Sequence, residues 1–149
     1  MRKTKLQALA LNGSADEVEA RFYEAMLAGD VERLMACWAD DEEVVCVHPG
    51  GARLCGVGAI RSTFEAMFAN GNVRVTPERV RKIEALASAV HNLVERIEVQ
   101  GPQGMVQAYL LATNVYHKTP QGWRMVLHHA SPGSLSDLAD LEAAPQVLH

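Results

Sequence analysis

Residues 104–131 read GMVQAYLLATNVYHKTPQGWRMVLHHAS. This stretch holds two runs rich in β-branched and aromatic residues, which favour extended structure, and the Pro and Gly between the runs favour a turn. Two similar runs precede it, and every connection is short, so sequential antiparallel pairing is expected. The sequence therefore predicts a four-stranded meander. Its extended segments are residues 73–86, 89–100, 104–117 and 123–131.

Helical patterns occupy the first half of the chain. Ser14 to Glu17 has the form of a capping box, and Gly29 can end the helix that follows. Asp30 can cap a second helix, whose apolar face would include Val31, Leu34, Met35 and Trp38. A short strand over 44–47 and a third helix from about 57 to 69 complete the pattern. Helices first and a meander last predict an α+β fold, in which helices cover one face of a curved sheet.

The composition limits the class of protein. At 149 residues the chain suits a single domain, and 18 acidic against 14 basic residues (net −4) argue against the basic patch that nucleic-acid binding needs. No apolar run approaches the ~20 residues that cross a bilayer, and three cysteines without a C-x-x-C spacing argue against a disulfide or zinc framework. We expect a soluble, cytoplasmic domain over residues 14–132. A poorly ordered leader (1–13) would precede it, and a tail (133–149), either a short docked helix or a frayed end, would follow.

The order of several motifs resembles the nuclear transport factor-like superfamily. The motifs are Ala28-Gly29-Asp30, Trp38-Ala39-Asp40-Asp41, the His48-Pro49-Gly50 turn, the helix start Gly56-Val57-Gly58-Ala59-Ile60 and the meander. The ending, from Gly122-Trp123-Arg124 to His128-His129-Ala130-Ser131-Pro132, is most similar to the SnoaL-like group. The resemblance covers about residues 14–132. It implies a cystatin-like, cone-shaped, mainly antiparallel mixed sheet that wraps around the N-terminal helices and encloses a pocket. It also implies a homodimer through the outer face of the sheet.

The same superfamily includes ketosteroid isomerase, cyclases, dehydratases and non-catalytic association domains, so the fold leaves the function open. Ketosteroid isomerase uses an Asp base and an oxyanion hole made of a Tyr and a protonated Asp. By the resemblance, His48 stands at the position of the base and Asn114 at that of the protonated Asp. The oxyanion Tyr corresponds to Phe22, which has no hydroxyl, while Tyr23 would point elsewhere on the helix. Because losing one oxyanion donor can cost ~100- to 1000-fold in rate, the standard steroid reaction is not expected here.

Strand alternation predicts which side chains enter the pocket. In 123–131 the larger, mostly apolar set is taken as the pocket face, which directs His129 inward and His128 outward. In 104–117 the set that contains Asn114 faces the pocket. The opposite set, which includes Leu111 and Val115, is apolar enough to form a dimer interface. Two adjacent strand histidines cannot bind one metal from one face, so no zinc site is expected.

The candidate catalytic residues are therefore His48, Asn114 and His129. His48 could accept a proton as a neutral imidazole, or only hydrogen-bond its own turn. Asn114 could donate to a ligand carbonyl or satisfy buried backbone groups, and His129 could be a pocket polar group or a satisfied core histidine. The predicted ligand-binding residues are Phe22, Trp38, Leu110, Ala112, Tyr116, Met125 and Leu127. No nucleotide-binding or metal-binding motif occurs in the sequence, so no cofactor is expected.

Two classes of function remain open. In the first, the pocket binds a small, largely apolar, carbonyl-containing organic ligand, on which the protein acts as an isomerase-, cyclase- or dehydratase-like enzyme. In the second, the protein is a non-catalytic module that binds a ligand or drives oligomerisation, which the missing oxyanion Tyr favours. Neither class involves a nucleic acid or a membrane. The first observation needed to decide between these two classes is whether His48, Asn114 and His129 converge on one cavity.

Overall fold

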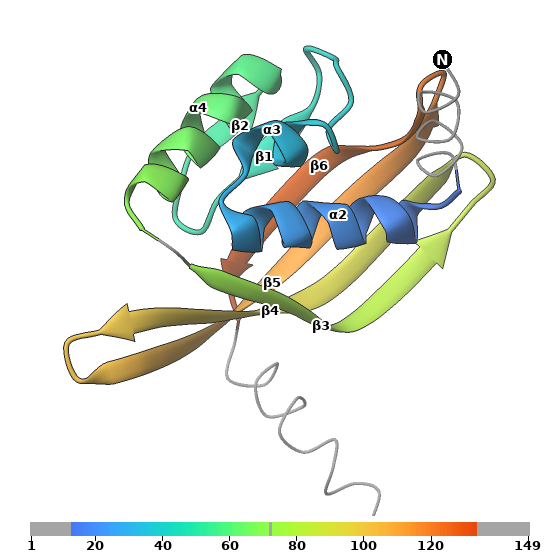
Figure 1. The fold of residues 1–149 in the computed structure, drawn as a ribbon. Helices are drawn as coiled ribbons and strands as arrows, with labels where there is room; N and C mark the ends of the chain where they lie inside the picture. Colours follow the sequence, from blue (N-terminus) through green and yellow to red (C-terminus); the bar gives the residue numbers. More distant parts are fainter. Residues whose placement is uncertain (1–12, 72, 134–149) are drawn as a thin grey trace, which may run out of the picture.

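The computed structural model describes residues 13–71 and 73–133, and it shows helices packed on one face of a six-stranded sheet (Figure 1). The helices are α2 (Ala15–Ala28), α3 (Val31–Met35) and α4 (Val57–Ala69). The strands are β1 (Val45–Val47), β2 (Arg53–Cys55), β3 (Arg74–Glu84), β4 (Ser88–Gly101), β5 (Gly104–Thr119) and β6 (Gly122–Pro132). The predicted α+β class with a mixed, mainly antiparallel sheet is confirmed.

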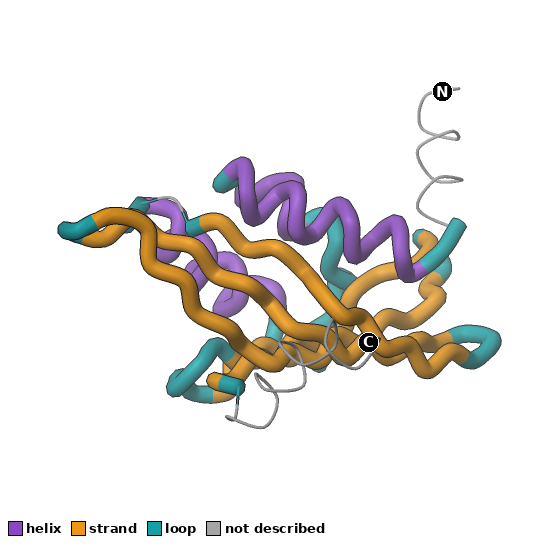
Figure 2. Tube along the Cα trace, turned by 90° about the horizontal axis from the view of Figure 1, so that it is seen from below, coloured by secondary structure: helices purple, strands orange, loops and turns teal. Residues whose placement is uncertain are grey.

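The strand order in the sheet is β2-β1-β6-β5-β4-β3. Strands β3 to β6 form the predicted antiparallel meander, and β1 extends it by pairing parallel with β6. β2 forms a hairpin with β1 that the sequence pattern did not predict. Figure 2 shows α2 as a separate layer on one side of the curved strands. We call the side that α2 covers the inner face of the sheet, and the opposite side the outer face.

Helix α2 begins and ends at the residues that its sequence indicates. The hydroxyl of Ser14 accepts a hydrogen bond from the amide of Glu17 at 3.2 Å, and Gly29 ends the helix with a left-handed φ of 66°. Phe22 is fully buried and packs edge-on against Phe64 of α4, with ring centroids 6.1 Å apart. The two long helices and the inner face therefore share one apolar core.

The second helix is shorter than predicted. Helix α3 ends at Met35, and the amides of Cys37 and Trp38 bond back only three residues. The chain then pairs with β6, where the amide of Met125 donates to the carbonyl of Cys37 at 2.7 Å and the amide of Ala39 donates to the carbonyl of Met125 at 2.9 Å. Pairing with the sheet thus replaces the last predicted helical turn and holds Trp38 beside β6.

A β-bulge in β6 changes the direction of its side chains. Two consecutive residues of β5 pair with Leu127 and Met125, so Val126 between them is an extra residue without a partner. The alternation therefore shifts by one position after Val126. His128 is consequently buried, with 2% exposure, while His129 is exposed. The prediction that His129 and Leu127 point into the pocket and His128 away from it was wrong for this reason.

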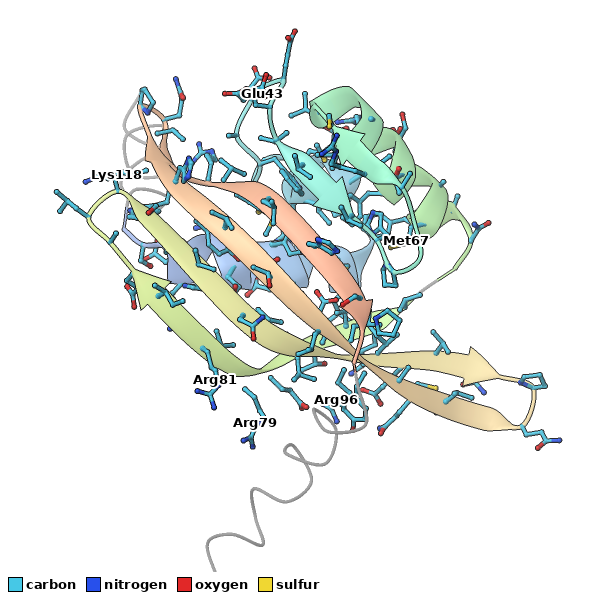
Figure 3. All side chains as sticks on the ribbon, turned by 180° about the vertical axis from the view of Figure 1, so that it is seen from behind. Glu43, Met67, Arg79, Arg81, Arg96 and Lys118 are labelled. Atoms are coloured by element: carbon cyan, nitrogen blue, oxygen red, sulfur yellow. The ribbon has the colours of Figure 1, made fainter. Side chains whose placement is uncertain are left out.

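The outer face carries no helix in the part of the chain that the structure describes, as the view from behind shows (Figure 3). Arg79, Arg81 and Arg96 lie at its β3–β4 side, where the guanidinium of Arg96 pairs with Glu78 at 3.3 Å. The predicted leader and C-terminal tail lie outside the described residues, apart from Gly13 and Gly133. Within those residues, no helix has both the length and the apolar character that a membrane span requires.

Candidate functional site

A cavity of about 310 Å³ lies between the helices and the inner face of the sheet. Most of its wall is apolar and comes from α2, α4 and four strands. The apolar lining residues are Met26, Pro49, Phe64, Met67, Val73, Val75, Ile97, Ala108, Leu110 and Ala130. Three ionisable side chains interrupt this lining: His48, Glu95 and His128. A mostly apolar cavity with a few converging polar groups is the usual form of a small-molecule site.

His48 follows β1 directly and begins the turn that the sequence predicts. Its carbonyl accepts a hydrogen bond from the amide of Gly51 at 2.8 Å, and Gly50 between them has a left-handed φ of 72°. The imidazole packs edge-on against Phe64, with ring centroids 5.0 Å apart, and its Nε2 lies 3.6 Å from the thiol of Cys46. Burial lowers the pKa of His48, so the ring is neutral at pH 7 and can accept a proton.

Glu95 of β4 presents a carboxyl group at the cavity wall although the residue is only 3% exposed. Its Oε2 accepts a hydrogen bond from the hydroxyl of Tyr23 at 2.7 Å. Burial raises the pKa of Glu95 to about 7; the charge of Glu19 adds to the rise, and the hydrogen bond from Tyr23 opposes it. Both protonation states are therefore populated near neutral pH, and a carboxyl group in this range can give or take a proton.

His128 lies beside Glu95 on the inner face of β6. Its Nδ1 is 2.6 Å from Oδ1 of Asn114, and its Nε2 is 3.9 Å from Oε2 of Glu95. Its ring centroid is 6.3 Å from that of His48. Burial lowers the pKa of His128 to about 3, and the neighbouring His48 and His129 contribute to the decrease. His128 is therefore a neutral hydrogen-bonding group rather than a cation.

Behind the cavity wall, a buried hydrogen-bond network joins α2 to β4, β5 and β6. The amide nitrogen of Asn114 donates to the hydroxyl oxygen of Tyr23 at 3.0 Å and to Oε2 of Glu19 at 3.4 Å. The same oxygen of Glu19 accepts from the hydroxyl of Tyr116 at 2.7 Å and lies 2.9 Å from Nδ1 of His91. Because buried polar groups are stable only when they are paired, this network fixes the orientation of each member.

The structure brings only part of the predicted site together. His48 and Leu110 line the cavity. Asn114 lies one layer behind the wall, and its N–H groups donate to protein atoms instead of pointing toward a ligand carbonyl. His129 and Leu127 face the outer side because of the bulge. Four further predicted residues are buried in the core without lining the cavity: Phe22, Ala112, Tyr116 and Met125.

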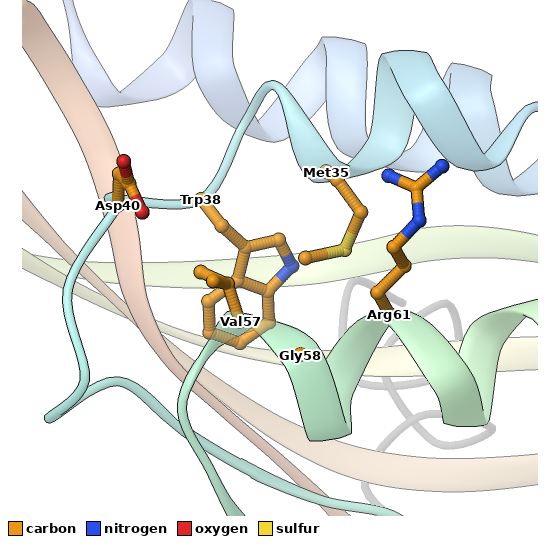
Figure 4. A pocket seen from close by; sticks show the side chains of 6 residues that line it. All are labelled: Met35, Trp38, Asp40, Val57, Gly58 and Arg61. Carbon is orange, nitrogen blue, oxygen red and sulfur yellow. The ribbon is translucent and has the colours of Figure 1, made fainter.

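Trp38 also lies away from the cavity. It lines a separate groove of about 250 Å³ between α3 and α4, together with Met35, Val57 and Arg61 (Figure 4). Arg61 is held at this groove by ion pairs with carboxylates of α3 and α4. The groove shares no lining residue with the cavity, so the predicted contact of Trp38 with a cavity ligand is not supported by its position.

Sequence reasoning missed three polar groups of the site: Tyr23, Glu95 and His128. Tyr23 was expected to point away from the site, yet α2 buries a face wide enough to include it and Glu19, four residues earlier. The spacing of these two residues was an available indication, because side chains four apart share one side of a helix. In β4, alternation places Glu95 on the same face as the buried Leu93, which was a second indication.

Other reactive groups are limited near the cavity. Burial raises the pKa of the Cys46 thiol to about 12, so this group stays protonated and unreactive as a nucleophile at neutral pH. Within residues 13–71 and 73–133, no three His, Cys, Asp or Glu side chains are placed to hold a metal ion. The arrangement therefore offers proton transfer and hydrogen bonding to a bound molecule.

Comparison with known proteins relates this fold to a family. The family model described as the SnoaL-like domain matches residues 16–134. A crystal structure from Thiobacillus denitrificans, described as a "putative calcium/calmodulin-dependent protein kinase type II association domain", is 35% identical to this chain. The match covers 81% of this chain and 96% of the other, with a TM-score of 0.74.

Two further structures resemble the chain over most of its length. A "putative dehydratase from the NTF2-like family" from Streptomyces avermitilis is 32% identical, covering 78% of this chain and 91% of its own, with a TM-score of 0.71. An NTF2-like protein with a cystatin-like fold from Novosphingobium aromaticivorans is 21% identical, covering 91% of each chain, with a TM-score of 0.69, and shows the fold alone. No protein of curated function matches the chain.

Proposed function

This chain belongs to the SnoaL-like domain family, and we propose that it binds a small, largely apolar, carbonyl-containing compound in the cavity and moves a proton on it, as an isomerase, cyclase or dehydratase does. One observation carries the proposal: the apolar wall is interrupted where His48 and Glu95 meet the same cavity. His48 is a neutral base, and Glu95, whose pKa is about 7, is partly protonated at neutral pH. A proton acceptor and a proton donor thus coexist at one site.

Elimination of water from a β-hydroxy carbonyl compound uses both groups. His48 takes the proton from the carbon between the carbonyl group and the hydroxyl-bearing carbon, and the electrons of that C–H bond form the new double bond. The C–O bond breaks, and the carboxylic acid of Glu95 protonates the departing oxygen, so that water leaves. Return of the proton from His48 to Glu95 restores the starting state. The relative described as a dehydratase supports this choice of reaction.

The carbonyl oxygen of such a compound lacks the hydrogen bond that the oxyanion Tyr donates in ketosteroid isomerase. Phe22, at the position that the resemblance gives to the oxyanion Tyr, has no hydroxyl, and the hydroxyl of Tyr23 donates to Glu95. Charge that develops on the carbonyl oxygen is therefore poorly stabilised. This argues against steroid isomerisation and favours a reaction in which protonation of a leaving group provides much of the driving force.

Turnover of enone, polyketide-like and β-hydroxyacyl compounds tests the proposal. We expect His48→Ala and Glu95→Gln each to lower kcat by at least ~100-fold, in line with the usual contribution of general acid–base groups. His129→Ala and Glu98→Gln are matched controls: they change the same residue types on the other side of their strands, and they should retain activity. The wild-type rate should fall above about pH 7 as Glu95 ionises. If His48→Ala turned over these compounds as fast as the wild-type protein, His48 would have no part in the mechanism.

The 35% identity to a structure described as an association domain favours a second candidate, a non-catalytic assembly module. In that case the cavity would bind compounds without turnover, or the protein would assemble independently of them. Two results together would support this candidate over the enzyme: thermal stabilisation of the protein by 1-indanol, a small apolar alcohol, and no turnover of any of the compounds above.

A further inference from the structure

We infer that Glu19 and Asn114 hold His128 with its proton on Nδ1, so that Nε2 presents a hydrogen-bond acceptor beside Glu95 and the cavity selects ligands that carry a hydroxyl group. The inference rests on the proposed function in taking the cavity as the ligand site. It adds the chemical group by which a ligand is recognised there, and it assigns a positioning role to two residues that do not line the cavity.

The first step is the direction of the hydrogen bonds at the two buried tyrosines. The hydroxyl of Tyr116 is 2.7 Å from Glu19 and that of Tyr23 is 2.7 Å from Glu95, so each phenol donates its one proton to a carboxyl group. Burial raises the pKa of both phenols, which keeps them protonated. The oxygen of Tyr23 can then only accept from its other neighbour, Asn114, at 3.0 Å.

The second step is the orientation of the Asn114 amide. Its two neighbours on the α2 side, the Tyr23 oxygen and Oε2 of Glu19, are both acceptors, so Asn114 must direct its N–H groups toward α2. The amide oxygen therefore faces His128, with Oδ1 2.6 Å from Nδ1. An amide oxygen can only accept, so Nδ1 of His128 carries a proton.

The third step follows from the neutral state of His128. A neutral imidazole carries one proton, and with that proton on Nδ1 the other nitrogen, Nε2, has a free lone pair. Among the described residues, none hydrogen-bonds Nε2, and Oε2 of Glu95 lies 3.9 Å from it. The side chain of His128 lines the cavity, so this acceptor is available to a bound molecule.

The geometry of the pair defines the group that fits. A separation of 3.9 Å between Nε2 of His128 and Oε2 of Glu95 is too long for a direct hydrogen bond. An oxygen atom at roughly 2.8 Å from each can bridge them. A hydroxyl group can donate to Nε2 while it accepts from protonated Glu95, whereas a ketone or ether oxygen leaves Nε2 without a partner. A ligand hydroxyl therefore satisfies both groups, and in the dehydration above it is the leaving group.

Imidazole ¹⁵N NMR of the wild-type protein tests the positioning step directly. We expect His128 at pH 7 to show a protonated Nδ1 and an unprotonated Nε2. Glu19→Gln should shift His128 toward a mixture of tautomers. A glutamine amide can donate to Asn114, which lets the amide group of Asn114 flip so that its N–H groups and its oxygen exchange places. Glu24→Gln, an exposed change on the same helix, should leave the tautomer unchanged. A proton on Nε2 in the wild-type protein would overturn the inference, whether or not the Glu19 variant folds.

Binding of 1-indanol, 1-indanone and indane tests the selection for a hydroxyl group. These probes share one bicyclic frame that suits a cavity of about 310 Å³. We expect 1-indanol to bind at least ~tenfold more tightly than the other two and to shift the Nε2 resonance of His128. Equal binding of all three would overturn the hydroxyl selection and leave the cavity as a ligand site. Preference for 1-indanol without turnover of β-hydroxyacyl compounds would overturn the proposed catalysis and leave this inference standing. Failure of all three to bind would overturn both.

Discussion

A carboxyl group buried among apolar side chains loses the water that would stabilise its charge, and Glu95 shows the consequence: burial raises its pKa from 4.5 to about 7. The folded protein therefore binds a proton at this position more tightly than the unfolded chain does. The stability that this proton provides is fully present below about pH 4.5 and is lost as the pH rises to about 7. Across that window the contribution of this proton to the free energy of unfolding falls by about 3 kcal/mol.

Glu95→Gln removes this titration and keeps an oxygen for the hydroxyl of Tyr23. We expect the free energy of unfolding of the variant, relative to wild type, to increase between about pH 4.5 and 7, by up to about 3 kcal/mol. Urea unfolding at a series of pH values measures the difference. His48 and His128 titrate in both proteins, so their lowered pKa values cancel in the comparison. A difference that stays constant with pH for Glu95→Gln would contradict the burial argument.

Ala108 offers a way to close the cavity without disturbing the core, because it lines the cavity and is itself exposed. We expect Ala108→Phe to weaken binding of 1-indanol by at least ~tenfold, since the ring would occupy the ligand volume, with less than about 1 kcal/mol change in stability. Titration calorimetry and urea unfolding measure the two effects. Gln107→Phe, on the other side of the same strand, should leave binding intact. If 1-indanol bound Ala108→Phe as tightly as the wild-type protein, its binding site would lie outside this cavity.

At the scale of single elements, local signals predict the ends of α2 and of the four meander strands well, but they missed the end of α3 and strand β2. Ser14 and Gly29 act through backbone groups within a few residues of themselves, so α2 begins and ends where its sequence indicates. The direction of side chains in β6 depends on distant contacts instead. Met125 is held by backbone hydrogen bonds to Cys37 and Ala39. No pattern within 123–131 reveals that Val126 must bulge out, so His128 could not be placed from the sequence.

The polar part of the site was only partly predicted, for a related reason. A turn marks His48, and the resemblance points to it directly. Glu19, Tyr23 and Glu95 lie within regular elements, and each is hydrogen-bonded in the interior by a residue of another element. Tyr23 donates to Glu95, and Asn114 donates to both Glu19 and Tyr23. Their burial becomes predictable once α2 is known to cross β4 and β5, which is a tertiary contact and not a local one.

Two glycines with open space around them should respond in opposite ways to the same substitution. Gly29 ends α2 with a left-handed φ of 66°, and Gly58 lies in the first turn of α4; a Cβ atom at either position meets nothing within 4 Å. We expect Gly29→Ala to destabilise the fold by about 1 kcal/mol and Gly58→Ala to stabilise it by up to about 1 kcal/mol. Thermal unfolding measures both. Equal effects of the two changes would show that helix-end conformation does not control stability here.

At the scale of the whole molecule, the sheet separates two apolar surfaces with different uses. The inner face forms the core and the cavity, while the outer face carries half-buried Leu111 and Val115 with no described helix over them. A groove of about 280 Å³ on this side is lined by further apolar residues of β1 and β6 and by Asp41 and Glu43. Uncovered apolar sheet faces of this kind are typical of interaction surfaces.

A second copy of the chain is the occupant that we expect on the outer face, because two such faces can bury each other symmetrically. Light scattering coupled to size-exclusion chromatography should show a wild-type dimer, and Leu111→Glu should give a monomer, since an unpaired carboxylate would be buried at the interface. Leu86→Glu, at a position that is 95% exposed in the β3–β4 turn, should remain dimeric. A monomeric wild type, or a dimeric Leu111→Glu, would contradict this interface. Because the cavity lies on the inner face, the Leu111→Glu monomer should still prefer 1-indanol over indane, which separates assembly from ligand recognition.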